Sequence, residues 1–446
     1  MLPVEPLSSA QIGELPPGAQ SVINLELLPG TLQRLVDLQH QHGDIYSLST
    51  EGEEAATYVV AHPDYAQQVL STRHADYRRF MVNGQMALVL GNGLLMSEGN
   101  DWKAQRKLLQ RCFHGDVLTS FNQYTTAGNV ALLKRWQRRA DEGQLIELTS
   151  DMLDLSLNFN LQAVFSVDAD DLLDAVGVQF LHRLSAPMRQ DTRSSLIFLK
   201  HTKYVRTRIV ELIVARRARR DPPFDLLNMF IDARYRDTGN AMLDQQIVDE
   251  ILSILTAGHE TVATGLKSVW YAISTNPKIA QLLREETDRV VGDAVPSTVH
   301  IASLPYARQV IQEALRIYPP IWVITRRAEA RSRIGPYDVP AETNVLVSPY
   351  LIHRHADFWP QPEVFDPDRF APDLVRNRHS HAYIPYGRGP RNCIGEELSM
   401  QEMLLHVSTF VRAFNVVHVD GVPGDYAAGF ALRSQTPIYV RLESRG

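Results

Sequence analysis

The sequence predicts a mainly α fold in which a large helical lobe packs against a small β-rich lobe. Apolar residues recur with helical spacing from Asp101 to about Thr275 and again after Pro277. Short runs rich in β-branched and aromatic residues lie near the N-terminus and again in the last third of the chain. A chain of 446 residues exceeds the usual size of a single core, which favours two packed subregions. We expect one domain over 1–446, with the β-rich lobe from about 31–75 plus 320–350 and the helical lobe from most of the remainder.

The β-rich lobe is predicted from short elements that alternate in type. Helices are expected at 31–42 and Pro63–Leu70, and strand-like runs lie between them at Ile45–Ser49 and Thr57–Ala61. Two further strand-like runs come much later, near Trp322–Ala328 and Asn344–Ser348.

The helical lobe is predicted from longer segments with a helical apolar pattern. These are 102–112, 117–141, 147–165, 170–185, 195–220, 244–275, Pro277–Val291 and Leu304–Ile317. The glycine-containing stretch Arg78–Ser97 is too apolar for a solvated loop, so it is expected either to line a pocket or to pack on the core as a loop.

Composition narrows the class of protein. Hydrophobic residues make up 44% of the chain and charged residues 22%, which fits a soluble globular protein, and the net charge of −6 argues against binding to polyanions such as nucleic acids. We expect the basic run 216–220 to be the solvated end of a helix. Two cysteines allow no disulfide framework and fit a reducing, cytoplasmic setting. Residues 1–29 contain no apolar run of about 18 residues, so no membrane anchor is expected there.

One stretch, the glycine-rich loop from Tyr386 to Gly395, surrounds Cys393 and is followed directly by a helical apolar pattern. A thiol near a helix N-terminus and near Arg391 should have a lowered pKa, because the dipole, free N–H groups and a cation all favour the thiolate. Gly389 and Gly395 permit a close approach to the backbone. The loop is therefore predicted to present one sulfur anion to a flat partner that lies against the backbone.

This loop resembles the haem-binding loop of the cytochrome P-450 family, F-x-x-G-x-R-x-C-x-G, with Tyr386 where the family usually has Phe. The resemblance implies a cytochrome P-450 fold, a haem b cofactor (iron protoporphyrin IX) and Cys393 as the axial ligand of the iron. It also implies that Gly387 and Gly395 contribute to the cofactor site. The other cysteine, Cys112, lacks such a loop and is expected to be a small core residue.

A second motif, Ala257-Gly258-His259-Glu260-Thr261, lies inside the predicted helix 244–275. A glycine within a helix costs about 1 kcal/mol relative to alanine, so a close approach to the backbone is expected there. The Thr261 hydroxyl can hydrogen-bond the carbonyl of Ala257 and open a notch in the helix. The motif resembles the family's oxygen-activation motif A/G-G-x-D/E-T, which implies that Glu260 and Thr261 are catalytic and that Ala257 and Gly258 border the cofactor. The alternative is a capped helix with a solvated glutamate.

Two other motifs resemble structural and cofactor-binding motifs of the family. Glu313 and Arg316, spaced i and i+3, would form a structural triad with Arg369, whereas on a generic helix they would form only a surface ion pair. Trp102 and Arg106 share one helix face and match the family's W-x-x-x-R helix, which binds a haem propionate. Two more arginines match propionate-binding positions: Arg391, and Arg326 with its neighbour Arg327 as the alternative, since only one of the two can face inward on a strand.

The family resemblance implies a haem-thiolate monooxygenase that inserts one oxygen atom from O2 into a mostly apolar small molecule, possible classes being a terpenoid, a fatty-acyl chain or another secondary metabolite. Electrons would come from a separate ferredoxin or flavodoxin with its reductase, because the chain has no room for a flavin or iron–sulfur domain. A peroxide-using or rearranging haem-thiolate enzyme and a haem-based sensor are the alternatives.

The expected pocket walls and docking surface complete the prediction. The walls are Met81–Leu95, Leu255, Thr256, Ile321–Ile324 and Phe430–Leu432, with Met188–Ser195 as a polar anchor that carries Arg189, Asp191 and Arg193. Lys103 and Lys107, with help from Arg388, are expected to dock an acidic electron donor. His353 and His355 lack obvious metal-ligand company and are expected to be structural.

Overall fold

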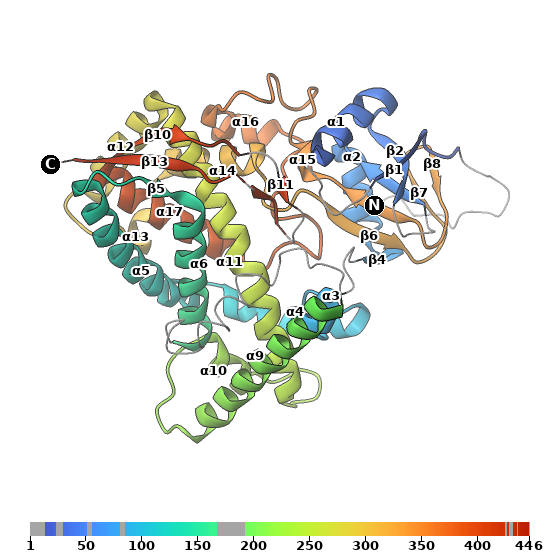
Figure 1. Cartoon of the computed structure of the whole chain (residues 1–446). Helices are drawn as coiled ribbons and strands as arrows, with labels where there is room; N and C mark the ends of the chain where they lie inside the picture. Colours follow the sequence, from blue (N-terminus) through green and yellow to red (C-terminus); the bar gives the residue numbers. More distant parts are fainter. Residues whose placement is uncertain are drawn as a thin grey trace.

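The computed structural model describes residues 14–23, 30–50, 56–80, 85–166, 192–423, 426–427, 431–434 and 436–445. Helices make up most of these residues and gather on one side of the molecule, while a β-rich part lies on the other (Figure 1). The predicted helix 170–185 and the polar anchor Met188–Asp191 lie outside the described residues.

The β-rich part is built on a six-stranded mixed sheet with the order β1-β2-β3-β9-β6-β4. β2 pairs antiparallel with β3, β3 pairs parallel with β9, and β9 pairs antiparallel with β6, so the strands near residue 50 and those near residue 340 form one sheet. The strands are β1 (Gly18–Ile23), β2 (Ile45–Thr50), β3 (Thr57–Val60), β4 (Tyr77–Arg79), β6 (Ile324–Ala328) and β9 (Asn344–Val347).

Short helices and a hairpin complete this part. They are α1 (Thr31–His42), α2 (Pro63–Gln67) with a π-helical turn at Gln68–Thr72, α15 (Pro349–Ile352) and the hairpin of β7 (Ser332–Ile334) with β8 (Tyr337–Val339). Another short helix, α16 (Pro372–Asn377), contacts the 3-10 segment Pro367–Phe370, which packs on α14 (Pro305–Ile317) of the helical part. The stretch Arg78–Ser97 is not only loop, because it contains the end of β4 and the short helix α3 (Gln85–Leu90).

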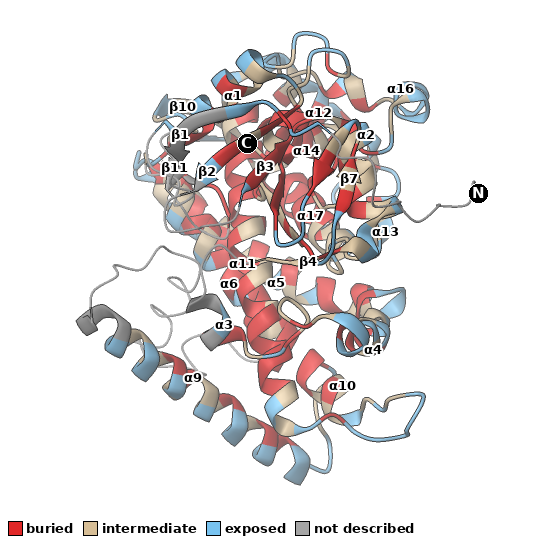
Figure 2. Ribbon diagram, turned by 90° about the vertical axis from the view of Figure 1, so that its right-hand side faces the viewer, coloured by how far each residue is buried: buried red, intermediate tan, exposed pale blue. Residues whose placement is uncertain are grey.

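The helical part surrounds α11 (Asp244–Thr275), which is buried along most of its length (Figure 2). An apolar pattern on nearly every face is typical of a central helix. Around it lie α4 (Gly99–Leu109), α5 (Asp116–Asp141), α6 (Leu148–Phe165), α9 (Thr192–Ala218), α10 (Leu226–Asp232), α12 (Pro277–Val291), α13 (Thr298–Ile301), α14 (Pro305–Ile317) and α17 (Glu396–Ala413). In the hydrophobic core of the helical part, Trp136 and Phe410 pack edge to face, with ring centroids 4.7 Å apart.

A second sheet lies within the helical part and was not predicted from the sequence. It joins β10 (Phe414–Asp420), β13 (Tyr439–Ser444) and β5 (Ile146–Glu147). A two-stranded ribbon pairs β11 (Tyr426–Ala427) with β12 (Arg433–Ser434). Among the helices that the structure describes, none is long and apolar enough to cross a membrane.

Candidate functional site

The loop before α17 carries Cys393 on a tight backbone turn. The backbone N–H of Cys393 donates to the carbonyl of Tyr386 at 2.8 Å, which closes the loop on itself. Gly389 has a φ of +78°, and a Cβ at this position would overlap the carbonyl oxygen of Leu70 in the π-helical turn. Only glycine therefore fits there, and the loop is locked against the β-rich part.

A cavity of about 420 Å³ separates this loop from α11. The exposed surface of Cys393 faces the cavity, and protein surrounds the residue on its other sides. Every site residue predicted from the sequence borders this one cavity except Glu260, which is buried in α11 behind it. The cavity-lining ones are Trp102, Arg106, Ala257, Gly258, Thr261, Arg326, Gly387, Arg391, Cys393 and Gly395.

The prediction of a lowered thiol pKa is wrong for the chain without a bound cation. Burial raises the pKa of Cys393 above its ordinary value, and this effect outweighs the opposing backbone N–H of Gly395 and the guanidinium groups of Arg106 and Arg79. The helix N-terminus and the cations therefore only partly offset the loss of water. A metal cation at the sulfur would supply the missing stabilisation of the thiolate.

The hydrogen bond predicted between Thr261 and Ala257 in α11 is present at the cavity wall. The Thr261 hydroxyl donates to the carbonyl of Ala257 at 2.6 Å, one turn back along the helix. The close approach expected at Gly258 comes from Asn160 of α6, because a Cβ on residue 258 would overlap the Asn160 side-chain oxygen. Glycine in this motif thus makes room for a neighbouring side chain as well as bordering the cavity.

A cluster of arginines borders the cavity where α4, β4 and β6 meet the cysteine loop. Arg106 donates to the carbonyl and side-chain oxygens of Asn392 at 2.8 and 3.0 Å. Arg391 pairs with Glu98 and donates to the carbonyl of Ser97 at 3.1 Å.

Arg326, rather than Arg327, faces the cavity. Arg326 is 5% exposed, whereas Arg327 lies over the Phe80 ring and donates to Asn344 at 2.6 Å. Burial, with Arg79 and Arg391 nearby, lowers the pKa of Arg326 to about 9. Successive side chains of a strand point to opposite faces, so of these two arginines of β6 only Arg326 points toward the cavity.

Arg79 of β4 belongs to the same cluster and was missed in the sequence. It lines the cavity, donates to the carbonyl of Leu95 at 2.6 Å, and has a pKa lowered to about 10 by burial and by the neighbouring Arg391. No motif marks this residue; only the pairing of β4 with β6, which sets Arg79 opposite Arg326, brings it into place.

The predicted structural triad is present at the C-terminal end of α14. Arg316 donates to Glu313 through two hydrogen bonds of 2.7 and 2.8 Å, and Arg369 lies 3.5 Å from the same carboxylate. Glu313 and Arg316 are fully buried, so this is not a surface ion pair. Arg316 also donates to the carbonyl of His353 at 2.9 Å, which ties α14 to the segment after α15.

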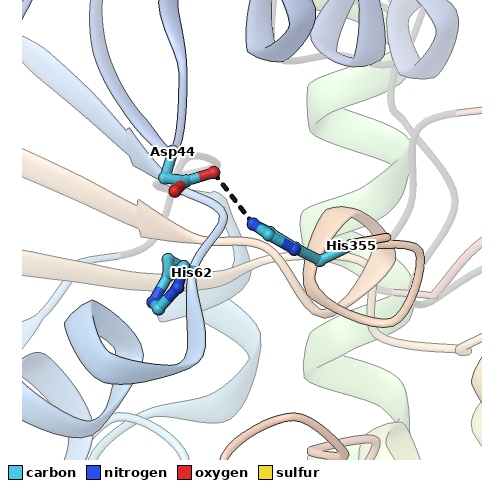
Figure 3. A group of neighbouring side chains, drawn as sticks. All are labelled: Asp44, His62 and His355. Carbon is cyan, nitrogen blue, oxygen red and sulfur yellow. Dashed lines mark hydrogen bonds and ion pairs between the residues drawn. The ribbon is translucent and has the colours of Figure 1, made fainter. Parts of the chain in front are cut away.

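The two histidines expected to be structural differ. His353 is buried, accepts from the backbone N–H of Ile384 at 2.9 Å, and has a pKa lowered to about 3 by burial, so it is structural as predicted. The expectation that His355 lacks ligand company is wrong, because Asp44 and His62 lie beside it (Figure 3).

This group of three is hydrogen-bonded in a way that disfavours metal binding. His355 Nε2 lies 3.0 Å from Asp44, while the Nδ1 atoms of both histidines accept backbone N–H groups, from Asp64 for His62 and from Asp357 for His355. A neutral ring that accepts at Nδ1 carries its proton on Nε2, which leaves no lone pair there for a metal.

Two other expectations concern residues outside the cavity. Cys112 is buried, and burial raises the pKa of its thiol to about 12, as suits a core residue. The basic run 216–220 is not simply solvated, because Arg216 is buried and holds Asp225 through contacts of 2.6 and 2.7 Å. Arg217 pairs with Asp244 at the surface.

The cavity suits an anionic cofactor that binds a soft metal. A cysteine sulfur on one wall is a ligand preferred by iron in thiolate haem sites. The guanidinium groups of Arg79, Arg106, Arg326 and Arg391 face the cavity with Glu98 as the one carboxylate paired to them in the described part of the chain. Such an excess of buried cations is unfavourable unless anions bind beside them. The two carboxylates of a porphyrin would supply these anions.

Comparison with known proteins gives the same assignment. The family model for cytochrome P-450 matches residues 15–440. Cyclooctatin synthase of Streptomyces melanosporofaciens is 29% identical over 85% of this chain and 84% of its own, and cyclooctat-9-en-7-ol 5-monooxygenase of the same organism is 27% identical over 94% of both. The crystal structure of the haem domain of cytochrome P450DA superposes with a TM-score of 0.87 at 21% identity, covering 98% of this chain and 99% of that one. The chain therefore belongs to the cytochrome P-450 family and is a monooxygenase of the haem-thiolate class.

Proposed function

We propose that the protein binds haem b through Cys393 and inserts one oxygen atom from O2 into a mostly apolar small molecule, with electrons from a separate redox protein. The observation that carries this proposal is a cavity bordered both by the Cys393 thiol and by Ala257, Gly258 and Thr261 of α11. A covalently attached haem is not proposed, because the chain has no C-x-x-C-H motif.

Different residues around the cavity would bind different parts of the cofactor. Cys393 would ligate the iron, and Trp102, Arg106, Arg326 and Arg391 would bind the propionates as the family resemblance implies; Arg79 is our addition to this set. A bound haem supplies the redox chemistry of dioxygen, while the protein binds, orients and delivers protons.

Proton delivery would use the two residues after His259. The Thr261 hydroxyl is held at the cavity wall by its bond to the Ala257 carbonyl, which uses its hydrogen and leaves its oxygen able to accept a hydrogen bond. Glu260 is 1% exposed and does not border the cavity, so its contribution would pass through Thr261 or through water rather than by direct contact with substrate.

The substrate is proposed to be a mainly apolar secondary metabolite, with a terpenoid as the favoured class. Much of the cavity lining consists of aliphatic and aromatic side chains, which favour a ligand with little charge. They are Leu94, Leu95, Phe113, Phe159, Ala163, Val164, Leu226, Ile254 and Ile321–Ile324. The two Streptomyces relatives, named for cyclooctatin and cyclooctat-9-en-7-ol, support a terpenoid as one such substrate.

The electron donor is proposed to be an acidic ferredoxin or flavodoxin with its reductase. Lys103, Lys107, Arg111 and Arg236 are exposed around a shallow hollow that also reaches Trp102 and Arg106 at the cavity. Such a concentration of cations in a chain with a net charge of −6 would steer a negatively charged partner to this face.

The deciding experiment measures oxygen uptake by the haem-loaded protein with a library of terpenoid, fatty-acyl and aromatic metabolites. We expect uptake that requires both a substrate and a ferredoxin with its reductase, and a product that carries one ¹⁸O atom from ¹⁸O2. Equal turnover with hydrogen peroxide and no reductant would identify a peroxide-using enzyme instead. Haem binding without turnover of any class would favour a sensor.

A further inference from the structure

A single carboxamide interrupts the apolar wall that α6 contributes to the cavity. Asn160 lies among Phe159, Ala163 and Val164, which also border the cavity, and it is only 6% exposed. An apolar residue of the same size would pack as well against these neighbours, so packing alone does not explain an amide at this position.

The amide is fixed by one of its two polar atoms. Asn160 Nδ2 donates to the carbonyl of Ser156 at 2.8 Å, one turn back along α6. This bond assigns the nitrogen to the helix side and directs Oδ1 to the opposite side.

Asn160 Oδ1 lies against α11 at the oxygen-activation motif. It occupies the space that a Cβ of residue 258 would need, and Ala257, Gly258 and Thr261 all border the same cavity. Within the part of the chain that the structure describes, no protein group donates a hydrogen bond to this oxygen. The glycine therefore makes room for an acceptor oxygen of a cavity-lining side chain, to which the described protein groups do not donate.

An acceptor in a largely buried side chain gains stability when a bound ligand supplies the donor. An amide oxygen accepts hydrogen bonds and cannot give one, so the matching group must be a hydroxyl or an N–H. An ionised carboxylate, the polar end of a free fatty acid, offers only acceptors and does not fit. The neighbouring Thr261 is no substitute, because its own hydrogen is donated to Ala257.

We propose that the substrate is an apolar molecule that already carries a hydroxyl group, and that Asn160 Oδ1 accepts a hydrogen bond from it. This inference rests on the proposed function and deepens it. Asn160 becomes a specificity-determining residue, and the reaction follows an earlier step that hydroxylated or hydrated the same carbon skeleton. A pocket built to hydrogen-bond a hydroxyl discriminates strongly against the analogue that lacks it, because the acceptor is then left unpaired.

The test compares equilibrium binding of matched ligands to the haem-loaded protein. A panel of polycyclic terpene alcohols, each with its parent hydrocarbon (cedrol and cedrane among them), and palmitic acid are titrated against the haem absorption band. We expect at least one alcohol to bind about ten-fold more tightly than its parent, which corresponds to about 1.4 kcal/mol. Asn160→Leu should remove this preference by weakening the alcohol while leaving the hydrocarbon unchanged.

Two further variants serve as controls for the effect of Asn160→Leu. Asn160→Asp keeps an oxygen acceptor and should keep the preference for the alcohol if Asn160→Leu is compromised by folding. Thr264→Ala removes a buried hydroxyl of α11 that does not border the cavity and should leave the preference intact.

The proposal is overturned if the wild type prefers no alcohol over its parent, if palmitic acid binds best, or if Asn160→Leu keeps the preference. Increased peroxide release by Asn160→Leu with alcohol and hydrocarbon alike, without a change in binding ratio, would assign the amide to bound water instead. Binding without oxygen insertion would leave this inference standing and contradict only the proposed function.

Discussion

The guanidinium carbon of Arg391 lies 4.2 Å from the centroid of the Trp102 indole. The contact joins the cysteine loop to α4, and a cation–π pair of this kind contributes about 0.5–2 kcal/mol depending on how far it is shielded from water. Two residues that would each hold a propionate are thus already fixed against one another in the protein chain itself. Pre-organisation of this kind reduces the ordering cost when the cofactor binds.

Arg326→Gln is expected to speed haem loss about ten-fold or more. A hydrogen bond to a charged group contributes about 1.5–3 kcal/mol, and Arg326 faces the cavity beside Arg79 and Arg391. Transfer of haem to an excess of apomyoglobin measures the rate. The haem-free variant should unfold at a higher temperature than the haem-free wild type, because one of several crowded buried cations is gone.

Arg327→Gln is the matched control on the same strand. Its guanidinium lies over Phe80 and donates to Asn344, so haem loss should stay at the wild-type rate. Equal haem loss in the two variants would mean that the choice between the neighbouring arginines is wrong.

Cys393→Ser should abolish the red-shifted Soret band that the ferrous carbonyl complex of a thiolate-ligated haem shows. Cys112→Ser should keep it, because Cys112 is packed in the core away from the cavity. The difference spectrum of the reduced protein with and without carbon monoxide measures this directly. A variant Cys393→Ser that retains the band would place the ligand elsewhere.

The site was predictable where chemistry is concentrated in a short stretch of chain. The loop around Cys393 and the run Ala257–Thr261 each carry glycines whose conformation or lack of a side chain has a local reason, and both border the cavity. The long helices were also predictable, because an apolar pattern repeated over α5, α6 or α11 is hard to produce by chance.

What escaped prediction depends on contacts between distant parts of the chain. Arg79 joins the arginine cluster only through the pairing of β4 with β6, and Asn160 meets Gly258 across nearly one hundred residues of sequence. Asp44 and His355, which also contact one another, are 311 residues apart in the sequence. Propensity and periodicity describe single elements, so they carry no information on which elements meet.

Thr261→Ala is expected to uncouple turnover. Oxygen and reductant should still be consumed, but a larger share should appear as hydrogen peroxide, because the hydroxyl held at the Ala257 carbonyl no longer orders protons at the cavity wall. The ratio of product to reductant measures coupling. Thr264→Ala changes a buried threonine one turn away that does not border the cavity, and it should remain coupled; unchanged coupling in Thr261→Ala would remove Thr261 from the mechanism.

The pair of Asp44 and His355 should make a small contribution to stability that depends on pH. The hydrogen bond to Asp44 raises the pKa of His355 above its ordinary value of 6.5, so the folded state binds this proton more tightly. That contribution is full below about pH 6.5 and is lost as the pH rises through the raised value. The pKa of Asp44 is lowered from 3.8, chiefly by the hydrogen bond to His355. The contribution of Asp44 to stability is therefore lost only as the pH falls through this lowered pKa.

Asp44→Asn tests this window. Because both groups are only partly buried, the wild type should exceed the variant by no more than about 1 kcal/mol in the free energy of unfolding near pH 5. The difference should shrink toward pH 8. Asp373→Asn, an exposed substitution on α16, should show no such trend, and a difference that grows with pH would contradict the assignment.

The basic hollow beside α4 provides the last prediction, which concerns the electron donor. Lys103 and Lys107 are both exposed and are spaced i and i+4, so they project from one side of the helix, while Trp102 and Arg106 reach the cavity. A donor that docks on this face would therefore be close to the cofactor edge. The alternative is that these lysines only keep a surface helix hydrated.

Reversing Lys103 and Lys107 to Glu should lower the rate of the first electron transfer from an acidic ferredoxin about ten-fold at low ionic strength. The wild-type rate should fall as salt is added, because the Debye length shrinks from about 10 Å at 0.1 M to about 3 Å at 1 M, while the variant's rate should hardly respond. Stopped-flow reduction under carbon monoxide measures both. The matched control reverses Lys278 and Arg289, two exposed cations of α12, which changes the net charge equally but leaves the hollow intact. If the control slows as much as the α4 variant, total charge rather than a docking surface governs the rate; if neither slows, the donor binds another face of the protein.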